Sequence, residues 1–178
     1  MSFTLYDAFV PTTRQLLGAL PGVIAKAEEH VAQTDCTDAE LFEARLADDM
    51  WTLPWHIRSC WAHSGYALDQ LAGGAYTPDF TSIPDSWDAM RSLIAEAEER
   101  MAKATPEEVD ALADKPVDFV IGGATQFTLP GKRFLLGFNL PNFQFHATTF
   151  YDILRMKGVP LSKRDYMGNP AGPMFQQR

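Results

Sequence analysis

Apolar residues recur at helical spacing in four long stretches of the chain. The first stretch covers residues 4–34, the second covers 49–71, the third begins near residue 84, and the fourth covers 132–157. In each stretch, apolar side chains follow one another at steps of three and four residues, which places them on one face of an α-helix. Four amphipathic helices with short connections bury these faces best against one another. The pattern therefore predicts an all-α fold, a four-helix bundle, formed by a single domain over residues 1–178.

Prolines, glycines and capping residues predict where the helices are interrupted. Pro11 and Pro21 each remove a backbone donor, so each should kink the first helix or begin a new first turn. Thr37 begins a capping box, which predicts a short helix ahead of the second long one. Gly158 should end the last long helix. We expect residues 162–178 to form an extended tail.

A short region between the third and fourth long helices has the period of a β-strand. Residues 117–121 alternate in character, and Gly122 and Gly123 then turn the chain towards a second extended segment that ends near residue 129. This arrangement predicts a small β-hairpin. Residues 75–83 have the composition of a loop.

Charge and composition exclude several classes of function. The chain has 178 residues and a net charge of −8, so it lacks the basic surface that nucleic acids or anionic lipids require. The beginning of the chain does not resemble a signal peptide, and no apolar run is long enough to span a membrane. We therefore expect a cytoplasmic protein with two free thiols, no nucleic-acid partner and no membrane partner.

The second long helix carries residues that can bind a metal. His56, Cys60 and His63 are spaced four and three residues apart, so they share one face, and Asp49 continues the same stripe. Imidazole and thiolate groups are good ligands for zinc-type cations. His56 and His63 are two turns apart, about 10 Å along the helix, so one ion cannot be held by both. The alternative is that these side chains belong to the core and its edge.

A second polar stripe lies on the aromatic-rich last helix. Asn142 and His146 are one turn apart, and Thr149 continues the same face. Buried polar groups need partners, because an unpaired one costs about 1–3 kcal/mol. His63 is the expected partner of His146 if the second and fourth helices face each other. We therefore expect a polar pocket inside the bundle. Its expected lining is His63, His146 and Asn142, with Asp49, Cys60 and Thr149 nearby.

Several motifs together resemble a known family. Residues 142–160 are similar to the signature of the DinB-like superfamily, whose members carry a His-x-x-x-His step and then a Tyr-Leu-Arg motif. The chain resembles most closely the branch described as domain of unknown function 1993. The motifs that carry this resemblance are residues 5–7, 10–11, 44–50, 141–146 and 153–155.

The resemblance implies a four-helix bundle, commonly a homodimer, with a metal site in many relatives. Relatives use one histidine from the second helix, here His63 or in another register His56, and two from the last helix. The second of these two falls on His146, but the first falls on Asn142, whose amide oxygen is a poorer ligand for zinc or nickel. A three-histidine site is therefore absent, and the cofactor is either none or a divalent metal such as zinc or nickel, with Cys60 as an alternative ligand.

Three functions are compatible with the sequence, which does not decide whether the protein is an enzyme. The first is a DinB-like bundle that binds a small molecule in its polar pocket. The second is a metal-dependent enzyme of the thiol transferase or hydrolase type that uses His63 and His146. The third is a non-catalytic protein whose dimer interface is its function.

Overall fold

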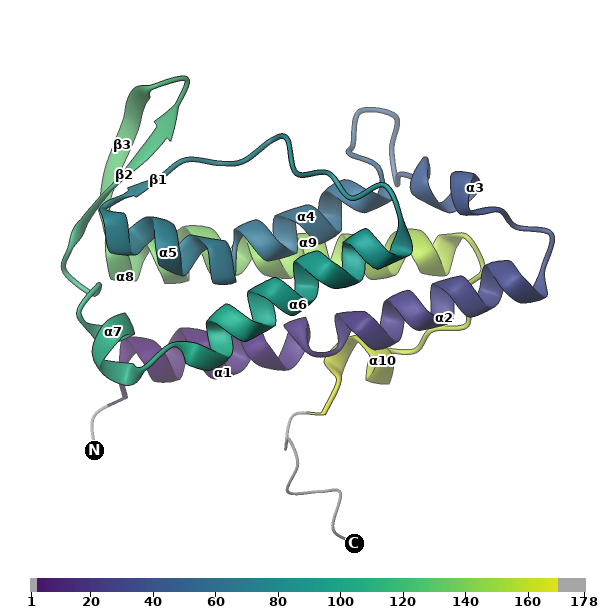
Figure 1. Cartoon of the computed structure of the whole chain (residues 1–178), viewed down its shortest axis with the longest axis horizontal. Helices are drawn as coiled ribbons and strands as arrows, with labels where there is room; N and C mark the ends of the chain where they lie inside the picture. The colour runs from purple at the N-terminus through teal and green to yellow at the C-terminus, as the bar shows by residue number, and fades with distance from the viewer. Residues whose placement is uncertain (1–2, 170–178) are drawn as a thin grey trace, which may run out of the picture.

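The long helices lie side by side, and a small sheet sits at one end of the molecule (Figure 1). The structure is a computed structural model, and it describes residues 3–169. Helix α6 packs against α1, α2, α4 and α5, while α4 packs along α9. The helices are α1 (Leu5–Leu17), α2 (Leu20–Gln33), α3 (Asp38–Phe42), α4 (Leu53–Ala62), α5 (Gly65–Gly73), α6 (Trp87–Lys103), α7 (Pro106–Asp110), α8 (Gly131–Phe134), the π-helical turn η1 (Leu135–Asn139), α9 (Leu140–Met156) and α10 (Lys163–Met167).

The prediction of one continuous helix over residues 49–71 is wrong, because the helix begins later and is divided into two. The chain becomes helical only at Leu53, and the helix divides into α4 and α5 around His63 and Ser64. The Ser64 hydroxyl donates to the carbonyl of Cys60 at 2.6 Å, which satisfies a backbone acceptor where α4 ends. A Cβ at Gly65 would lie 2.8 Å from the Cα of Ala97, so glycine allows α5 to approach α6 closely.

The predicted hairpin is confirmed, but a third strand joins it. Strands β2 (Pro116–Ile121) and β3 (Ala124–Pro130) are antiparallel, and both turn glycines, Gly122 and Gly123, have positive φ. Strand β1 (Ala75–Tyr76) pairs in parallel with β2, inside the region predicted as a loop. A strand of two residues has no period to detect, so only its pairing with β2 reveals it.

The first and last helical stretches differ from single continuous helices. The first divides into α1 and α2, with Pro21 in the first turn of α2 as predicted, while Pro11 lies inside α1. The last divides into α8, η1 and α9, with Pro141 in the first turn of α9. The expected extended tail is wrong for residues 163–167, which form α10, and residues 170–178 lie outside the described part.

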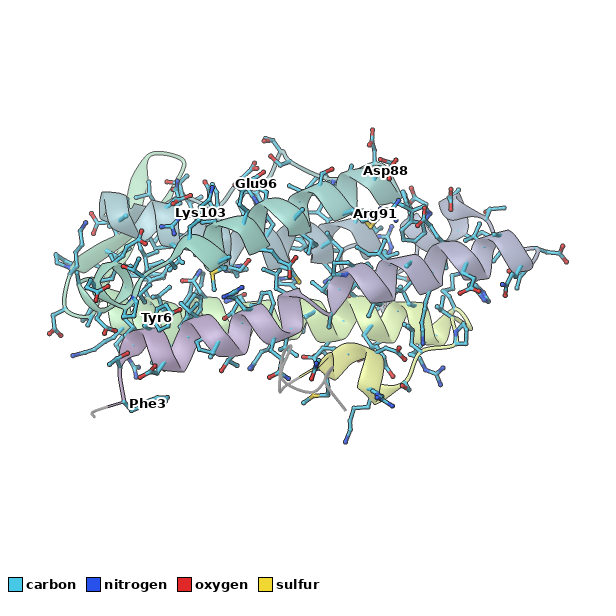
Figure 2. The ribbon with its side chains drawn as sticks, turned by 60° about the horizontal axis from the view of Figure 1, so that its bottom comes forward. Phe3, Tyr6, Asp88, Arg91, Glu96 and Lys103 are labelled. Atoms are coloured by element: carbon cyan, nitrogen blue, oxygen red, sulfur yellow. The ribbon has the colours of Figure 1, made fainter. Side chains whose placement is uncertain are left out.

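Apolar side chains from the long helices and from several short ones form the core, and ion pairs connect neighbouring helices at the surface. Arg91 on α6 pairs with Glu28 on α2 and, at 2.6 Å, with Asp88 one turn earlier on its own helix (Figure 2). No helix within residues 3–169 has the length and apolar character needed to cross a bilayer. The fully buried core side chains include Phe9, Ile24, Ile57, Met90 and Phe150.

Candidate functional site

Three buried histidines meet where α4 packs against α9. His56 lies in the first half of α4, His63 is the C-cap residue of that helix, and His146 lies in the middle of α9. Their side chains are 1%, 8% and 7% exposed, respectively. The ring of His146 lies 5.2 Å from that of His56 and 6.0 Å from that of His63, measured between centroids. The expected closeness of His63 and His146 is therefore confirmed.

His56 and His146 form a direct hydrogen bond whose direction follows from their neighbours. The Nε2 atom of His56 lies 3.2 Å from the carbonyl oxygen of Trp51, which can only accept, so Nε2 carries the proton. The Nδ1 atom of neutral His56 is therefore bare, and it accepts from the Nδ1 atom of His146 at 3.0 Å. His146 is consequently left with a bare Nε2, which has no hydrogen-bond partner within residues 3–169.

His63 takes the same tautomer as His56 and the opposite one to His146. The side-chain amide of Asn139 donates to its Nδ1 at 3.2 Å, so the proton of neutral His63 sits on Nε2. The Tyr76 hydroxyl lies 3.4 Å from the same Nδ1 and donates to the carbonyl of Ala62 at 3.2 Å. The rings of Trp51, His146 and His63 form a nearly parallel stack, with interplanar angles of 12° and 5° between neighbours.

Burial keeps all three imidazoles neutral. Desolvation lowers the pKa of His63 to about 3, with a smaller contribution from the charge of Arg58. Desolvation also lowers the pKa of His146 to about 3, and His56, His63 and Arg58 act in the same direction. Burial lowers the pKa of His56 as well, although its bond to the Trp51 carbonyl opposes the shift. The cluster therefore offers lone pairs and N–H groups at neutral pH, and no charge.

A cavity of about 290 Å³ opens beside the cluster. His56 and His146 line it together with Asn142, whose amide donates to the carbonyl of Phe138 at 2.7 Å. Asp49 also lines it, from the loop before α4. The complete lining is Asp49, Met50, Trp51, His56, Asn142, Phe145 and His146.

Three residues expected at the pocket lie outside its lining. His63, the C-cap residue of α4, contacts the cluster but does not line the cavity. Thr149 lines a neighbouring groove of about 500 Å³, and its hydroxyl donates to the backbone of Phe145. Cys60 lies in the hydrophobic core, where burial raises the pKa of its thiol. Cys60 therefore stays protonated, without the thiolate that a metal ligand or nucleophile requires.

Sequence reasoning missed three residues of this region. Trp51 stacks on His146, and its carbonyl fixes the tautomer of His56. Asn139 lies seven residues before His146, so the helical period that linked Asn142 to His146 would also have found it. Arg58 is 2% exposed although it is a charged residue, and no sequence pattern marks it as buried.

The donor set falls short of a three-ligand metal site. Catalytic zinc is normally held by three protein ligands, and structural zinc by four. Here two imidazole nitrogens face each other, while Asn142 contributes an amide and Cys60 a protonated thiol. No three His, Cys, Asp or Glu side chains within residues 3–169 are placed to hold one ion together. The residues present therefore do not fit the metal centre that the family resemblance implies.

Comparison with known proteins shows which fold and which family the chain has. The structure is similar to the crystal structure of a DinB family member protein from Shewanella denitrificans, with a TM-score of 0.79 and 25% sequence identity. The match covers 93% of this chain and 92% of that chain, so the protein has a DinB-like helical fold. Within this class, residues 5–167 match the family described as Domain of unknown function (DUF1993), and the chain belongs to that family. No curated protein matches the chain.

Proposed function

We propose that this protein binds a small organic molecule in the cavity beside His56 and His146. The bare Nε2 of His146 carries the proposal, because it is an acceptor without a partner among residues 3–169, on a residue that lines the cavity. Trp51 and Phe145 add apolar surface to the lining, and Asn142 adds a polar group. A mostly apolar cavity with a few directed polar groups is the usual form of a small-molecule site.

The low pKa of His146 favours binding over general-base catalysis. A general base works best with a pKa near the working pH, whereas the pKa of His146 is about 3. In catalytic triads a carboxylate behind the histidine stabilises its protonated form. Here neutral His56 takes that place, so it orients the ring without favouring its protonation. His146 is therefore suited to accept a hydrogen bond from a ligand.

A metal-dependent enzyme is the second candidate, and one observation favours it. The Nδ1 atoms of His56 and His146 lie 3.0 Å apart, close enough for both rings to reach one ion. His56 would then replace His63, whose Nδ1 faces Asn139 and Tyr76. Because a third metal ligand is missing, small-molecule binding is the better supported function. Elemental analysis of protein purified without a histidine tag separates the two.

The proposal also includes the wider organisation of the chain. We infer that the four long helical runs (α1 with α2, α4 with α5, α6, and α9) correspond to the four helices of one bundle domain. We further infer a homodimer that buries exposed apolar side chains such as Phe145, which is 54% exposed on α9. Sedimentation that shows only monomer at micromolar concentration would contradict the homodimer.

A fragment screen followed by NMR tests the small-molecule site. Ligands of the cavity should shift the ring nitrogen signals of His146 and the indole signal of Trp51. Replacing Trp51 with Ala removes the ring that stacks on His146, so it should weaken these ligands about tenfold. The control is Phe127→Ala on β3, an aromatic residue 38% exposed that lines neither the cavity nor the groove described above. Binding that leaves the His146 signals unchanged would contradict the proposal.

A further inference from the structure

Arg58 is a buried cation that makes no ion pair within the described residues. Its side chain is 2% exposed, and within residues 3–169 it takes part in no ion pair. The Nε and Nη2 atoms are buried and have no hydrogen-bond partner. A buried charge without a partner is strongly unfavourable, so proteins seldom retain one without a compensating group.

The unpaired atoms form one edge of the guanidinium group. The N–H bonds of Nε and Nη2 point in the same direction, which is the geometry that binds both oxygens of a carboxylate at once. The charge of Asp79 acts on Arg58, but the Asp79 carboxylate does not bind this edge. Asp79 directs one carboxylate oxygen to its own loop, where it accepts from the backbone and hydroxyl of Thr81, both at 2.7 Å.

A single aromatic residue connects Arg58 to the histidine cavity. The guanidinium carbon lies 5.1 Å from the ring centroid of Phe80, and that ring packs edge-on against Trp51 at 6.4 Å. Trp51 in turn lines the cavity and stacks on His146. Phe80 is 49% exposed and lies between β1 and α6, outside any helix or strand, so its ring can move with little loss of packing.

We propose that the ligand of the histidine cavity carries a carboxylate, and that Arg58 binds this group when Phe80 moves aside. The inference rests on the proposed small-molecule site and names the chemical class of its ligand. The rest of the ligand lies in the cavity beside Trp51 and His146. Its carboxylate accepts two hydrogen bonds, one from Nε and one from Nη2 of Arg58. The ligand thereby supplies the ion-pair partner that Arg58 lacks among residues 3–169.

Matched pairs of an acid and its neutral amide test this proposal by calorimetry. The probes are benzoate with benzamide, and phenylacetate with phenylacetamide. Since hydrogen bonds to charged groups are stronger than neutral ones, each acid should bind about tenfold more tightly than its amide. The Arg58→Met variant should lose that preference. The control Arg91→Met, which removes an arginine already paired with Glu28 and Asp88, should keep it.

Thermal unfolding of the same variants distinguishes a ligand-binding arginine from a structural one. Arg58→Met removes an uncompensated buried charge and keeps much of the side-chain volume, so it should raise the melting temperature of the ligand-free protein. A lower melting temperature would overturn the proposal, as would an acid preference that persists in Arg58→Met. Amides that bind as tightly as acids would overturn the role of Arg58 and leave the small-molecule site standing. Absence of binding by both members of each pair, together with a fragment screen that leaves His146 unchanged, would overturn both.

Discussion

Acidification should destabilise this protein well before its carboxylates begin to titrate. In the unfolded chain a histidine has a pKa of about 6.5. In the folded protein the pKa of His63 and that of His146 are each about 3. The folded state therefore binds fewer protons than the unfolded state between these values, so the free energy of unfolding falls as pH decreases through this range.

The loss of free energy of unfolding at about pH 5 can be calculated as long as the folded pKa values of His63 and His146 lie clearly below 5. Each of the two histidines then favours the unfolded state by about 2 kcal/mol relative to neutral pH, so the pair removes about 4 kcal/mol. His56, whose pKa is also lowered, acts in the same direction. The pKa values of Asp79 and Asp165 are about 2, and these carboxylates are ionised in both states at pH 5, so they add little to this change. A loss of this size is a large part of the stability of a typical domain.

Urea unfolding at about pH 7.5 and about pH 5 measures the effect. The double variant His63→Gln with His146→Gln should be less stable at neutral pH, but its stability should change far less between the two conditions. His30→Gln, which replaces a histidine outside the cluster, should retain the wild-type dependence. A wild-type free energy of unfolding that differs by less than about 1 kcal/mol between the two conditions would refute the reasoning.

Two further substitutions test the cavity and the packing. Asn142→His should raise the zinc affinity about tenfold or more in calorimetry, because it adds a third imidazole to a cavity that already has two, whereas Asn142→Gln should not change it. Gly131→Ala should destabilise the protein by about 1–3 kcal/mol in urea unfolding, because overpacked sites force backbone shifts. The new Cβ would lie 2.1 Å from the backbone oxygen of Leu112. Gly22→Ala, where no atom lies within 4 Å of the new Cβ, is the control and should be neutral or stabilising.

The features that the sequence predicts well are those encoded within a few residues. The capping box of Thr37 forms as predicted, with Glu40 as its partner, because both bonds lie inside one turn. The hairpin turn at Gly122 is equally local, since two glycines supply the positive φ that such a turn requires. The break at Pro21 follows from a missing backbone donor.

The features that sequence reasoning misses depend on contacts between distant segments. His56, rather than His63, bonds to His146, because that choice is made by the packing of α4 on α9. Strand β1 exists only through its pairing with β2. The burial of Arg58 likewise depends on tertiary packing, as its contact with Phe80 from the segment between β1 and α6 illustrates. A charged residue on a helix is otherwise expected at the surface.

The electrostatics of the site connect the histidines to the buried arginine. Neutral His56 bonds to His146 and to a backbone carbonyl, and neutral His63 accepts from an amide, so the three imidazoles carry no charge that needs a counterion. Arg58 differs, because its charge is permanent and its unpaired edge cannot be satisfied by losing a proton. The same charge lowers the pKa of His63 and His146, which helps to keep their lone pairs free. A bound carboxylate would offset this charge and make protonation of His146 easier. The charge state of the ligand and the hydrogen-bonding role of the histidines are thus coupled through Arg58.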